Sequence, residues 1–390
     1  MRSTFSQSMN EVRLIRNPFL ALAPLDDSYL AYDMERGRLH RLNPAAALIL
    51  ELCDGTRSAE RLRSELAALD VTLTDKACSE WIDQACNDGL LMPSAPVSPT
   101  LSEILSQARS LRDHGETLAA FTCQRHATLL FQCDAGEWKF LGELAHIVGR
   151  RADAREAYEQ YLKLQPDDAE ISHILNALRD EPPPPRAPDR CIEHLYARFS
   201  EFYDDSMCGD LEYQAPSRLM EVVASELGER GSLDVLDLGC GTGLFGREVR
   251  SRSRRLTGVD LSPEMVALAQ AAAVYDELAV GEITAWLASR HGAEFDLIAA
   301  CDSLIYFGDL RQVVVPAVRL LRPGGLLAFT LERGETQPFL LTDSGRYCHT
   351  AAHVKEVAEE AGFSNVTISE SFLRYEYGEP VTGLVAVLRR

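Results

Sequence analysis

Residues 235–243, Val-Leu-Asp-Leu-Gly-Cys-Gly-Thr-Gly, connect an apolar run to a glycine-rich turn that opens a helix. Glycine has no side chain, so such a turn lets the backbone approach a bound ligand closely at the carboxyl end of a strand. Residues 241–246 also fit the G-x-G-x-x-G pattern of dinucleotide-binding proteins, and a nicotinamide cofactor has to be weighed. Asp237, two residues before the first glycine, and the continuation through Cys240 argue against that interpretation.

The same residues resemble motif I of the class I S-adenosylmethionine-dependent methyltransferases, and further elements follow in that family's order. Asp260 ends the second apolar run, 17 residues after the last glycine, where the family's acid accepts both ribose hydroxyls. Glu282 ends the third run, where the family usually has Asp beside the adenine. Residues 295–303 match the strand under the transferred methyl, and residues 320–326 match the turn before the fifth strand. The resemblance spans about 200 residues.

The resemblance implies a set of cofactor contacts. In this family the segment before the first strand folds over the cofactor, which brings in two tyrosines of 195–207, although aromatic residues there could equally belong to a helix core. The expected cofactor-binding residues are Tyr196, Tyr203, Asp237, Gly239, Cys240, Gly241, Gly243, Asp260, Leu261, Met265, Glu282, Ile283 and Cys301.

The acceptor side is predicted from chemistry. An anionic acceptor such as a carboxylate needs orientation, whereas an amine or hydroxyl also needs a group that takes its proton. The segment Ser-Gly-Arg-Tyr-Cys-His-Thr would supply charge-assisted and neutral donors to a carboxylate. We therefore expect O-methylation of an Asp or Glu side chain or a C-terminus, with N-methylation close behind. The expected catalytic residues are Asp302, Tyr306, Arg346, Tyr347 and His349.

The elements that position these residues alternate between strand and helix. This order predicts a parallel sheet with helices on both faces, an α/β Rossmann-like domain over residues 190–390. The expected strands are 233–239, 255–260, 278–283, 295–301 and 326–332, with helices at 261–273 and 310–321.

Residues 101–180 contain no strand signal, and two proline-rich segments, 92–100 and 181–189, have the composition of linkers. The helical segment fits the 34-residue tetratricopeptide pattern, so we expect a tetratricopeptide-like spacer. With the linker and the C-terminal domain it resembles the tetratricopeptide-containing methyltransferases of bacteria. The matching positions are Trp138, Leu141, Gly142, Ala145, Ala154, Tyr158, Tyr161 and Pro166.

Residues 14–92 have short strand-like runs followed by three helical stretches, which predicts an α+β winged-helix domain. Asn43-Pro44 is a helix start, and Asp54-Gly55 ends that helix. The core from Asn43 to Gly55 and the closing D-G-L-L resemble the PqqD-like peptide chaperones. That resemblance implies a leader peptide bound as an added strand at an exposed sheet edge such as Arg38 to Leu42, and against the third helix.

Composition excludes several classes. The chain of 390 residues has 39 Lys+Arg against 59 Asp+Glu, a net charge of -20, so no nucleic-acid partner is expected. A DNA-binding winged helix is disfavoured because acids balance the arginines of 57–65. The ten cysteines are scattered without a C-x-x-C pair, which predicts reduced thiols and no metal. No apolar run reaches the ~20 residues of a membrane span, and no secretory signal is evident, so a cytoplasmic location is expected.

Together these features predict an enzyme that uses S-adenosyl-L-methionine to methylate a ribosomally made precursor peptide, whose leader is held by residues 14–92. Other peptide-tailoring enzymes are expected partners, and a membrane is not. One alternative is a small-molecule or quinone-related methyltransferase with a purely structural N-terminal domain. Another is a non-catalytic peptide-binding scaffold, which the intact glycines of 239–243 argue against.

Overall fold

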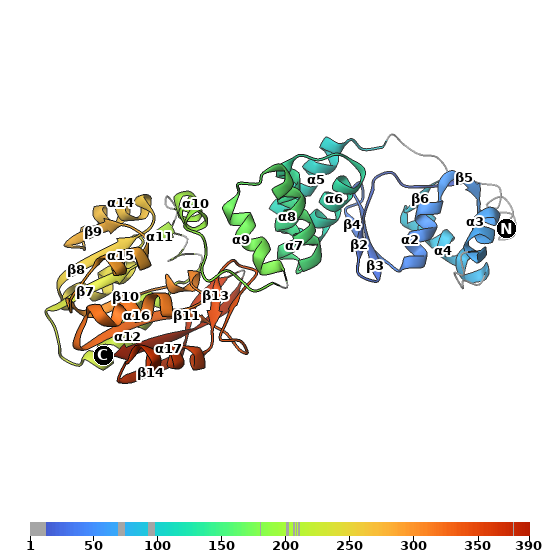
Figure 1. The fold of residues 1–390 in the computed structure, drawn as a ribbon. Helices are drawn as coiled ribbons and strands as arrows, with labels where there is room; N and C mark the ends of the chain where they lie inside the picture. The colour runs from blue at the N-terminus through green and yellow to red at the C-terminus, as the bar shows by residue number, and fades with distance from the viewer. Residues whose placement is uncertain are drawn as a thin grey trace. The chain divides into compact units, whose positions relative to one another are not determined.

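The computed structural model describes residues 13–68, 75–92, 98–179, 181–199, 203–205, 207, 209, 211–376 and 378–390. The chain forms two compact units, residues 1–166 and 167–390 (Figure 1). Residues 93–97 of the first predicted linker lie outside the described residues. Among the helices that are described, none combines the length and the apolar character that crossing a bilayer requires.

The first unit opens with two small antiparallel sheets around one apolar core. The sheets have the strand orders β5-β1-β6 and β2-β3-β4. The predicted helix start is confirmed, because the Asn43 side chain accepts a hydrogen bond from Ala46 N at 2.8 Å. The elements are β1 (Arg13–Arg16), β2 (Leu20–Leu25), β3 (Ser28–Asp33), β4 (Arg38–Leu42), α2 (Pro44–Leu52), β5 (Asp54–Ser58), α3 (Ala59–Ala68), α4 (Asp75–Asp88) and β6 (Leu91–Met92).

Four helices complete this unit: α5 (Leu101–Asp113), α6 (Thr117–Leu130), α7 (Ala135–Ile147) and α8 (Arg151–Leu164). Helix α6 packs against β2 and β3. His126 of α6 is buried, and its Nδ1 accepts a hydrogen bond from Leu22 N at 3.1 Å. Burial lowers the pKa of His126 to about 4, so the ring is neutral and can accept. Helix α6 thus occupies the outer edge of β2.

Helices α7 and α8 pack closely against each other. A Cβ added to Gly142 would lie 2.3 Å from the Tyr158 ring, so only glycine allows these helices to approach so closely. Tyr158 is almost completely buried. The large residue of one helix fills the space left by the small residue of the other.

Replacing Gly142 with alanine should therefore destabilise the first unit by about 1–3 kcal/mol, because the new methyl group overlaps the Tyr158 ring. Urea unfolding followed by circular dichroism measures this change. Gly136→Ala, at an exposed position of the same helix, is the matched control and should instead stabilise by up to about 1 kcal/mol. Equal effects of the two substitutions would contradict the packing argument.

The second unit is built on one mixed sheet with the strand order β9-β8-β7-β10-β11-β15-β14. All five predicted strands form, and β7 to β11 pair in parallel as expected. The central strands are β7 (Leu233–Leu238), β8 (Ser253–Asp260), β9 (Glu277–Val280), β10 (Phe295–Ala300) and β11 (Leu321–Arg333). Between them lie α13 (Leu244–Val249), the 3-10 helix η3 (Arg250–Arg252), α14 (Pro263–Ala272), α15 (Ile283–Ser289), the 3-10 helix η4 (Leu304–Tyr306) and α16 (Arg311–Leu320).

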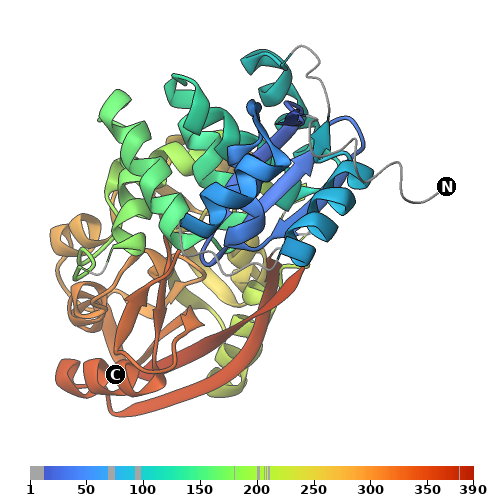
Figure 2. The same cartoon turned by 90° about the vertical axis from the view of Figure 1, so that its right-hand side faces the viewer.

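The far end of the sheet departs from the prediction of a purely parallel arrangement. Strand β15 (Glu379–Arg389) pairs antiparallel with both β11 and β14 (Asn365–Glu376). The two long strands lie side by side in Figure 2, where they are red. A tight turn at Gly378 joins them, and strands so joined can pair only antiparallel. A short pair, β12 (Phe339–Leu341) and β13 (Tyr347–His349), extends the carboxyl end of β11.

Alternation along the strands gives the second unit two apolar layers. Val235 and Leu297 face a layer with α12 (Ala215–Leu227) and α13. Their neighbours Leu236 and Ile298 face the opposite layer with α15, α16 and α17 (Ala351–Ala361). Because these parallel strands are buried on both faces, they are continuously apolar, as β7 and β10 are in sequence.

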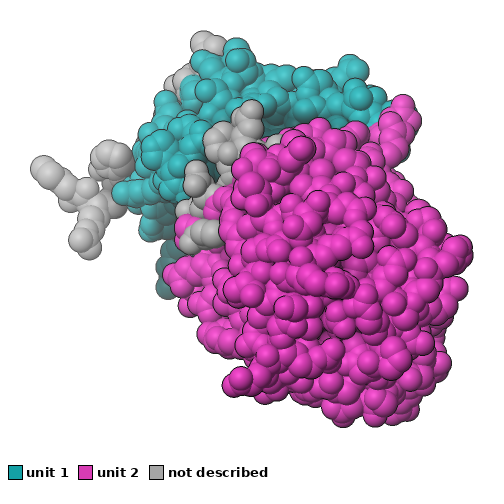
Figure 3. Space-filling view, turned by 90° about the vertical axis from the view of Figure 1, so that its left-hand side faces the viewer, with its two compact units in different colours: residues 1–166 teal, residues 167–390 magenta. Residues whose placement is uncertain are grey.

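The second predicted linker, residues 181–189, is not free in the structure. Tyr347 Oη donates to Pro184 O at 2.5 Å, and Gly308 N donates to Pro185 O at 2.9 Å. Helix α9 (Ala169–Leu178) also belongs to this unit, since His173 Nε2 donates to Gly345 O at 2.9 Å. The proline-rich segment and α9 are therefore part of residues 167–390, magenta in Figure 3.

Candidate functional site

A cleft opens at the carboxyl ends of β7, β8 and β10, where the strand order reverses, which is the usual ligand position in such sheets. Its lining combines apolar and aromatic side chains with a few polar groups, as is usual for small-molecule sites. The structure brings twelve of the predicted residues to its walls: Tyr196, Tyr203, Gly239, Gly241, Asp260, Leu261, Met265, Glu282, Ile283, Cys301, Asp302 and Tyr306.

A smaller cavity continues from the cleft, and the two share Tyr203, Gly239, Gly241 and Cys301. Two further predicted residues, Asp237 and Cys240, line this second cavity. Gly243, the remaining predicted cofactor residue, is the N-cap of α13. The sequence-based set therefore surrounds two joined cavities.

The glycines of the turn have different tasks. A Cβ added to Gly241 would meet no atom within 4 Å, so this face of the turn is open to a ligand. A Cβ added to Gly239 would lie 2.4 Å from Ser303 Cβ, so this glycine makes room for the segment after β10. Both have positive φ, +52° and +70°, a conformation that glycine adopts without strain.

Asp260, at the end of β8, is fixed by the backbone around it. One carboxylate oxygen accepts from Gly241 N at 2.8 Å and the other accepts from Ser262 N at 2.9 Å. Burial raises the pKa of Asp260, while these hydrogen bonds to its anionic form act in the opposite direction. A carboxylate held in this way still has lone pairs for the two hydroxyls of a ribose.

Glu282 serves as the N-cap of α15. Its carboxylate accepts from Thr284 N at 2.9 Å and Ala285 N at 2.8 Å, and Arg186 lies 3.4 Å away. Burial opposes the charged form of Glu282, but these hydrogen bonds and Arg186 lower its pKa overall. Sequence reasoning missed Arg186 because it lies in the proline-rich segment assigned to a linker.

Tyrosines form one wall of the cleft. Tyr196 of α10 (Asp189–Phe199) and Tyr306 have their hydroxyl oxygens 2.9 Å apart, and Tyr203 of α11 (Tyr203–Asp205) contacts the Tyr196 ring. Tyr213, which sequence reasoning did not single out, lies 3.5 Å from Cys301 Sγ. Burial raises the pKa of all four phenols, so they are neutral hydrogen-bonding groups at neutral pH.

The structure corrects the predicted acceptor side. Tyr347 is fully buried, and its hydroxyl is used by the Pro184 carbonyl. His349 is fully buried as well: its Nε2 donates to Gly308 O at 3.0 Å, and burial lowers its pKa to about 4. Tyr347 and His349 are two residues apart on β13, and their side chains contact the segments that pack on this strand. Neither side chain reaches the cleft.

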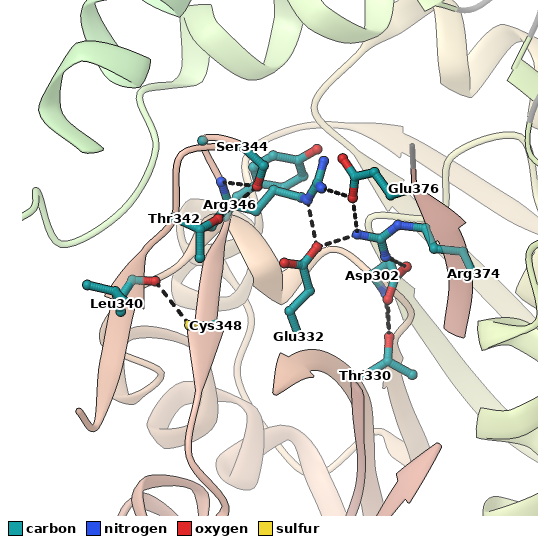
Figure 4. Close-up of polar contacts among 12 residues, drawn as sticks. Asp302, Thr330, Glu332, Leu340, Thr342, Ser344, Arg346, Cys348, Arg374 and Glu376 are labelled. Atoms are coloured by element: carbon teal, nitrogen blue, oxygen red, sulfur yellow. Dashed lines mark hydrogen bonds and ion pairs between the residues drawn. The ribbon is translucent and has the colours of Figure 1, made fainter. Parts of the chain in front are cut away.

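Arg346, the third member of that predicted cluster, belongs to an ion-pair network with Glu332, Glu376 and Arg374 (Figure 4). Arg346 Nε donates to Glu332 at 2.6 Å, and its other arm contacts Glu376. Arg374 contacts Glu332 and donates to Asp302 at 3.0 Å. The ion pairs link Arg346 to Asp302 on the cleft through Glu332 and Arg374. The charge of Arg346 also acts on the cleft residue Tyr306, where it opposes the burial that raises the pKa.

Asp302 is the member of this network that lines the cleft. Thr330 Oγ1 donates to its carboxylate at 2.6 Å and accepts from its backbone N at 2.7 Å. Its φ of +50° is unusual for a residue with a side chain, and the surrounding hydrogen bonds hold it there. Sequence reasoning missed the partner Arg374 because it lies on β14, 72 residues away.

These features fit S-adenosylmethionine, the cofactor that the sequence resemblance implies. Asp260 suits the ribose hydroxyls, the open turn at Gly241 admits the ligand, and the tyrosine wall suits an apolar and cationic group. Within the described residues, no group of three or more His, Cys, Asp or Glu is arranged to hold a metal ion.

Comparisons with known proteins agree with this geometry. Residues 236–329 match the family model of the methyltransferase domain, and residues 29–91 match that of coenzyme PQQ synthesis protein D, PqqD. A malonyl-[acyl-carrier protein] O-methyltransferase of Pseudescherichia vulneris is 31% identical over 36% of this chain and 53% of its own length. Human methyltransferase-like protein 27 is 31% identical over 35% and 56%. The chain thus spans about half the length of these curated relatives.

Among solved structures, an S-adenosylmethionine-dependent methyltransferase from Mesorhizobium loti is 22% identical, with a TM-score of 0.36 over 44% of this chain and 96% of that one. We draw nothing further from that likeness. The family matches and the cleft define the second unit as carrying a class I S-adenosylmethionine-dependent methyltransferase domain. The first unit carries a PqqD-like domain.

Asp260→Ala should weaken the binding of S-adenosylhomocysteine by about 1.5–3 kcal/mol, roughly 10- to 100-fold in Kd, because a charged partner of the ribose is lost. Isothermal titration calorimetry of the full chain measures this. Glu277→Ala, which removes a surface acid paired with Arg255, is the control and should bind normally. Unchanged affinity of the Asp260 variant would contradict the assigned position of the ribose.

Proposed function

We propose that this protein transfers the methyl group of S-adenosylmethionine to an oxygen of a peptide that its PqqD-like domain holds. The observation that carries the proposal is the presence, in one chain, of the cleft around Asp260 and a PqqD-like sheet with an open edge at β4. The peptide would be a ribosomally made precursor whose leader is the held part, and other tailoring enzymes would act on the same precursor.

Strand β4 supports the peptide half of the proposal. Among the described strands β4 pairs only with β3, so its outer backbone groups are available to an extended chain. The other edge of this sheet, at β2, is occupied by His126. Leu39 is 40% exposed on β4, between the exposed Arg38 and Arg41. These side chains suit a leader segment that combines apolar and acidic residues.

The expectation of a carboxylate acceptor needs revision. That expectation depended on Arg346, Tyr347 and His349 lying together at the acceptor. Tyr347 and His349 do not reach the cleft, and the charge of Arg346 is neutralised by Glu332 and Glu376. Arg186, the cation on the described cleft wall, is paired with Asp189 and Glu282. A further carboxylate would therefore find no free cation of the protein among the described residues of this region, and the positive charge that it meets would be the sulfonium of the cofactor.

A hydroxyl acceptor suits this site better. Asp302 lines the cleft, and Thr330 and Arg374 orient its carboxylate, which would accept the proton that a hydroxyl loses on methylation. S-Adenosylmethionine itself supplies an activated methyl group on its sulfonium sulfur. The protein orients the acceptor and excludes water, the tyrosine wall being suited to both. The similarity to O-methyltransferases supports an oxygen acceptor and does not distinguish a hydroxyl from a carboxylate.

Asp302→Asn tests the proposed proton acceptor. Asparagine tolerates the positive φ at this position, so the fold should persist. We expect kcat to fall by about 100-fold, while S-adenosylhomocysteine binds within about twofold of the unaltered protein. The assay follows a 14 Da mass gain on peptides encoded by short neighbouring reading frames. An active Asn variant whose product is lost in mild alkali would instead indicate a methyl ester and a carboxylate acceptor.

Leu39→Asp tests the peptide-binding edge. Leu39 is exposed, so the substitution should leave the free energy of unfolding unchanged. It should weaken the affinity for the substrate peptide by about tenfold. Leu130→Asp, at another exposed apolar position of the same unit, is the matched control. Equal affinities of both variants, or methylation of small molecules in preference to any peptide, would favour the small-molecule methyltransferase.

A further inference from the structure

Three glycines around the predicted cofactor turn make room for the side chain of Tyr275. A Cβ added to Gly246 would lie 2.4 Å from Tyr275 Oη, and one added to Gly258 would lie 2.9 Å from the Tyr275 ring. A Cβ on Gly243 would lie 3.1 Å from the same ring. These glycines, on α13, at its N-cap and on β8, therefore form a slot that the Tyr275 ring fills. Gly246 is also the last glycine of the G-x-G-x-x-G pattern at 241–246. The close approach of Tyr275 accounts for a glycine there without a dinucleotide.

At the inner end of the slot the Tyr275 hydroxyl donates to Asp237 Oδ2 at 2.7 Å. Asp237 is fully buried, and its Oδ1 has no hydrogen-bond partner among the described residues. Asp237 also lines the smaller cavity, beside Cys240 and Gly241. A buried carboxylate oxygen without a partner is costly, and a cationic group of a ligand that reaches Oδ1 from that cavity on binding would satisfy it.

S-Adenosylmethionine carries an ammonium group on its amino-acid portion, and Asp260, the expected partner of its ribose, lies in the adjoining cleft. We infer that Tyr275 is a positioning residue of the cofactor site: held by its glycine slot, its hydroxyl fixes Asp237 so that Oδ1 faces the ligand's ammonium group. This inference rests on the cofactor of the proposed function. It assigns a role to a residue that belongs to none of the methyltransferase motifs recognised in the sequence.

The charges around Asp237 make the interaction sensitive to pH. Burial raises the pKa of Asp237 to about 7, the Tyr275 hydrogen bond lowers it and nearby Asp260 raises it. The other titratable groups on this cavity are the phenols of Tyr203 and Tyr213 and the thiols of Cys240 and Cys301, whose pKa values are all raised, so they are neutral. A cation binds the ionised carboxylate, so affinity should increase as the pH rises through about 7.

The test compares two ligands on the full chain by titration calorimetry. S-Adenosylhomocysteine has the amino-acid portion, and 5′-methylthioadenosine lacks it. Tyr275→Phe should weaken the first ligand by about tenfold and leave the second within about twofold. Gly246→Ala, which displaces the ring from its slot, should give the same selective loss. Tyr158→Phe, at a buried tyrosine of the first unit, is the matched control and should alter neither ligand.

On the unaltered protein, affinity for S-adenosylhomocysteine should rise about tenfold from pH 6 to pH 8, while that for 5′-methylthioadenosine stays flat. Equal loss of both ligands in the two variants, no loss of either, or the same pH response for both ligands would overturn the role of Tyr275 while leaving the cofactor assignment intact. If neither ligand bound the unaltered protein, the cofactor assignment would fail together with this inference.

Discussion

The methyltransferase domain depends on one constraint, the parallel pairing of β7 with β8 on one side and β10 on the other. In this register Asp237 lies opposite Gly258 and Ala299, and all three strands end at the same edge. Helices must then cover both faces. The chain continues from β7 to β8 and β9 on one side and then crosses back to β10 on the other side of β7, so a crevice remains at that edge. The glycine turn, Asp260 and Cys301 meet there because the strands that carry them end together.

Compensation of buried acids is the second theme. Asp302 and Glu332 are stabilised by Arg374, which is itself almost completely buried, and Arg346 adds a second cation. Removing one partner from such a network leaves an uncompensated charge, so these side chains are held in one arrangement. Asp237 differs because its hydrogen-bond partner is a neutral phenol. A carboxylate left in that state is suited to a ligand that brings its own positive charge.

In the first unit, the helical segment predicted to be a spacer contacts the β2-β3-β4 sheet through α6. A spacer would leave both edges of the β2-β3-β4 sheet open, whereas His126 occupies the edge at β2 and the remaining open edge is β4. Helices α5 to α8 therefore belong to the same compact unit as the PqqD-like domain. A peptide bound on β4 would pair with a sheet whose other edge, at β2, already contacts α6.

The sequence by itself determined the local features: the start of α2 at Asn43, the five central strands and the residues of the cofactor turn, because capping, periodicity and glycine spacing act over a few residues. It also placed Asp302 and Tyr306 on the cleft, since both follow directly from the end of β10. Tertiary structure alone decided the partners from distant segments. Antiparallel pairing of β14 brings Arg374 to the site, and the docked proline segment brings Arg186. A slot of glycines holds Tyr275. None of these three arrangements leaves a periodic signal in the sequence. For the same reason Tyr347 and His349, which a local pattern placed at the acceptor, are packed against other parts of the chain.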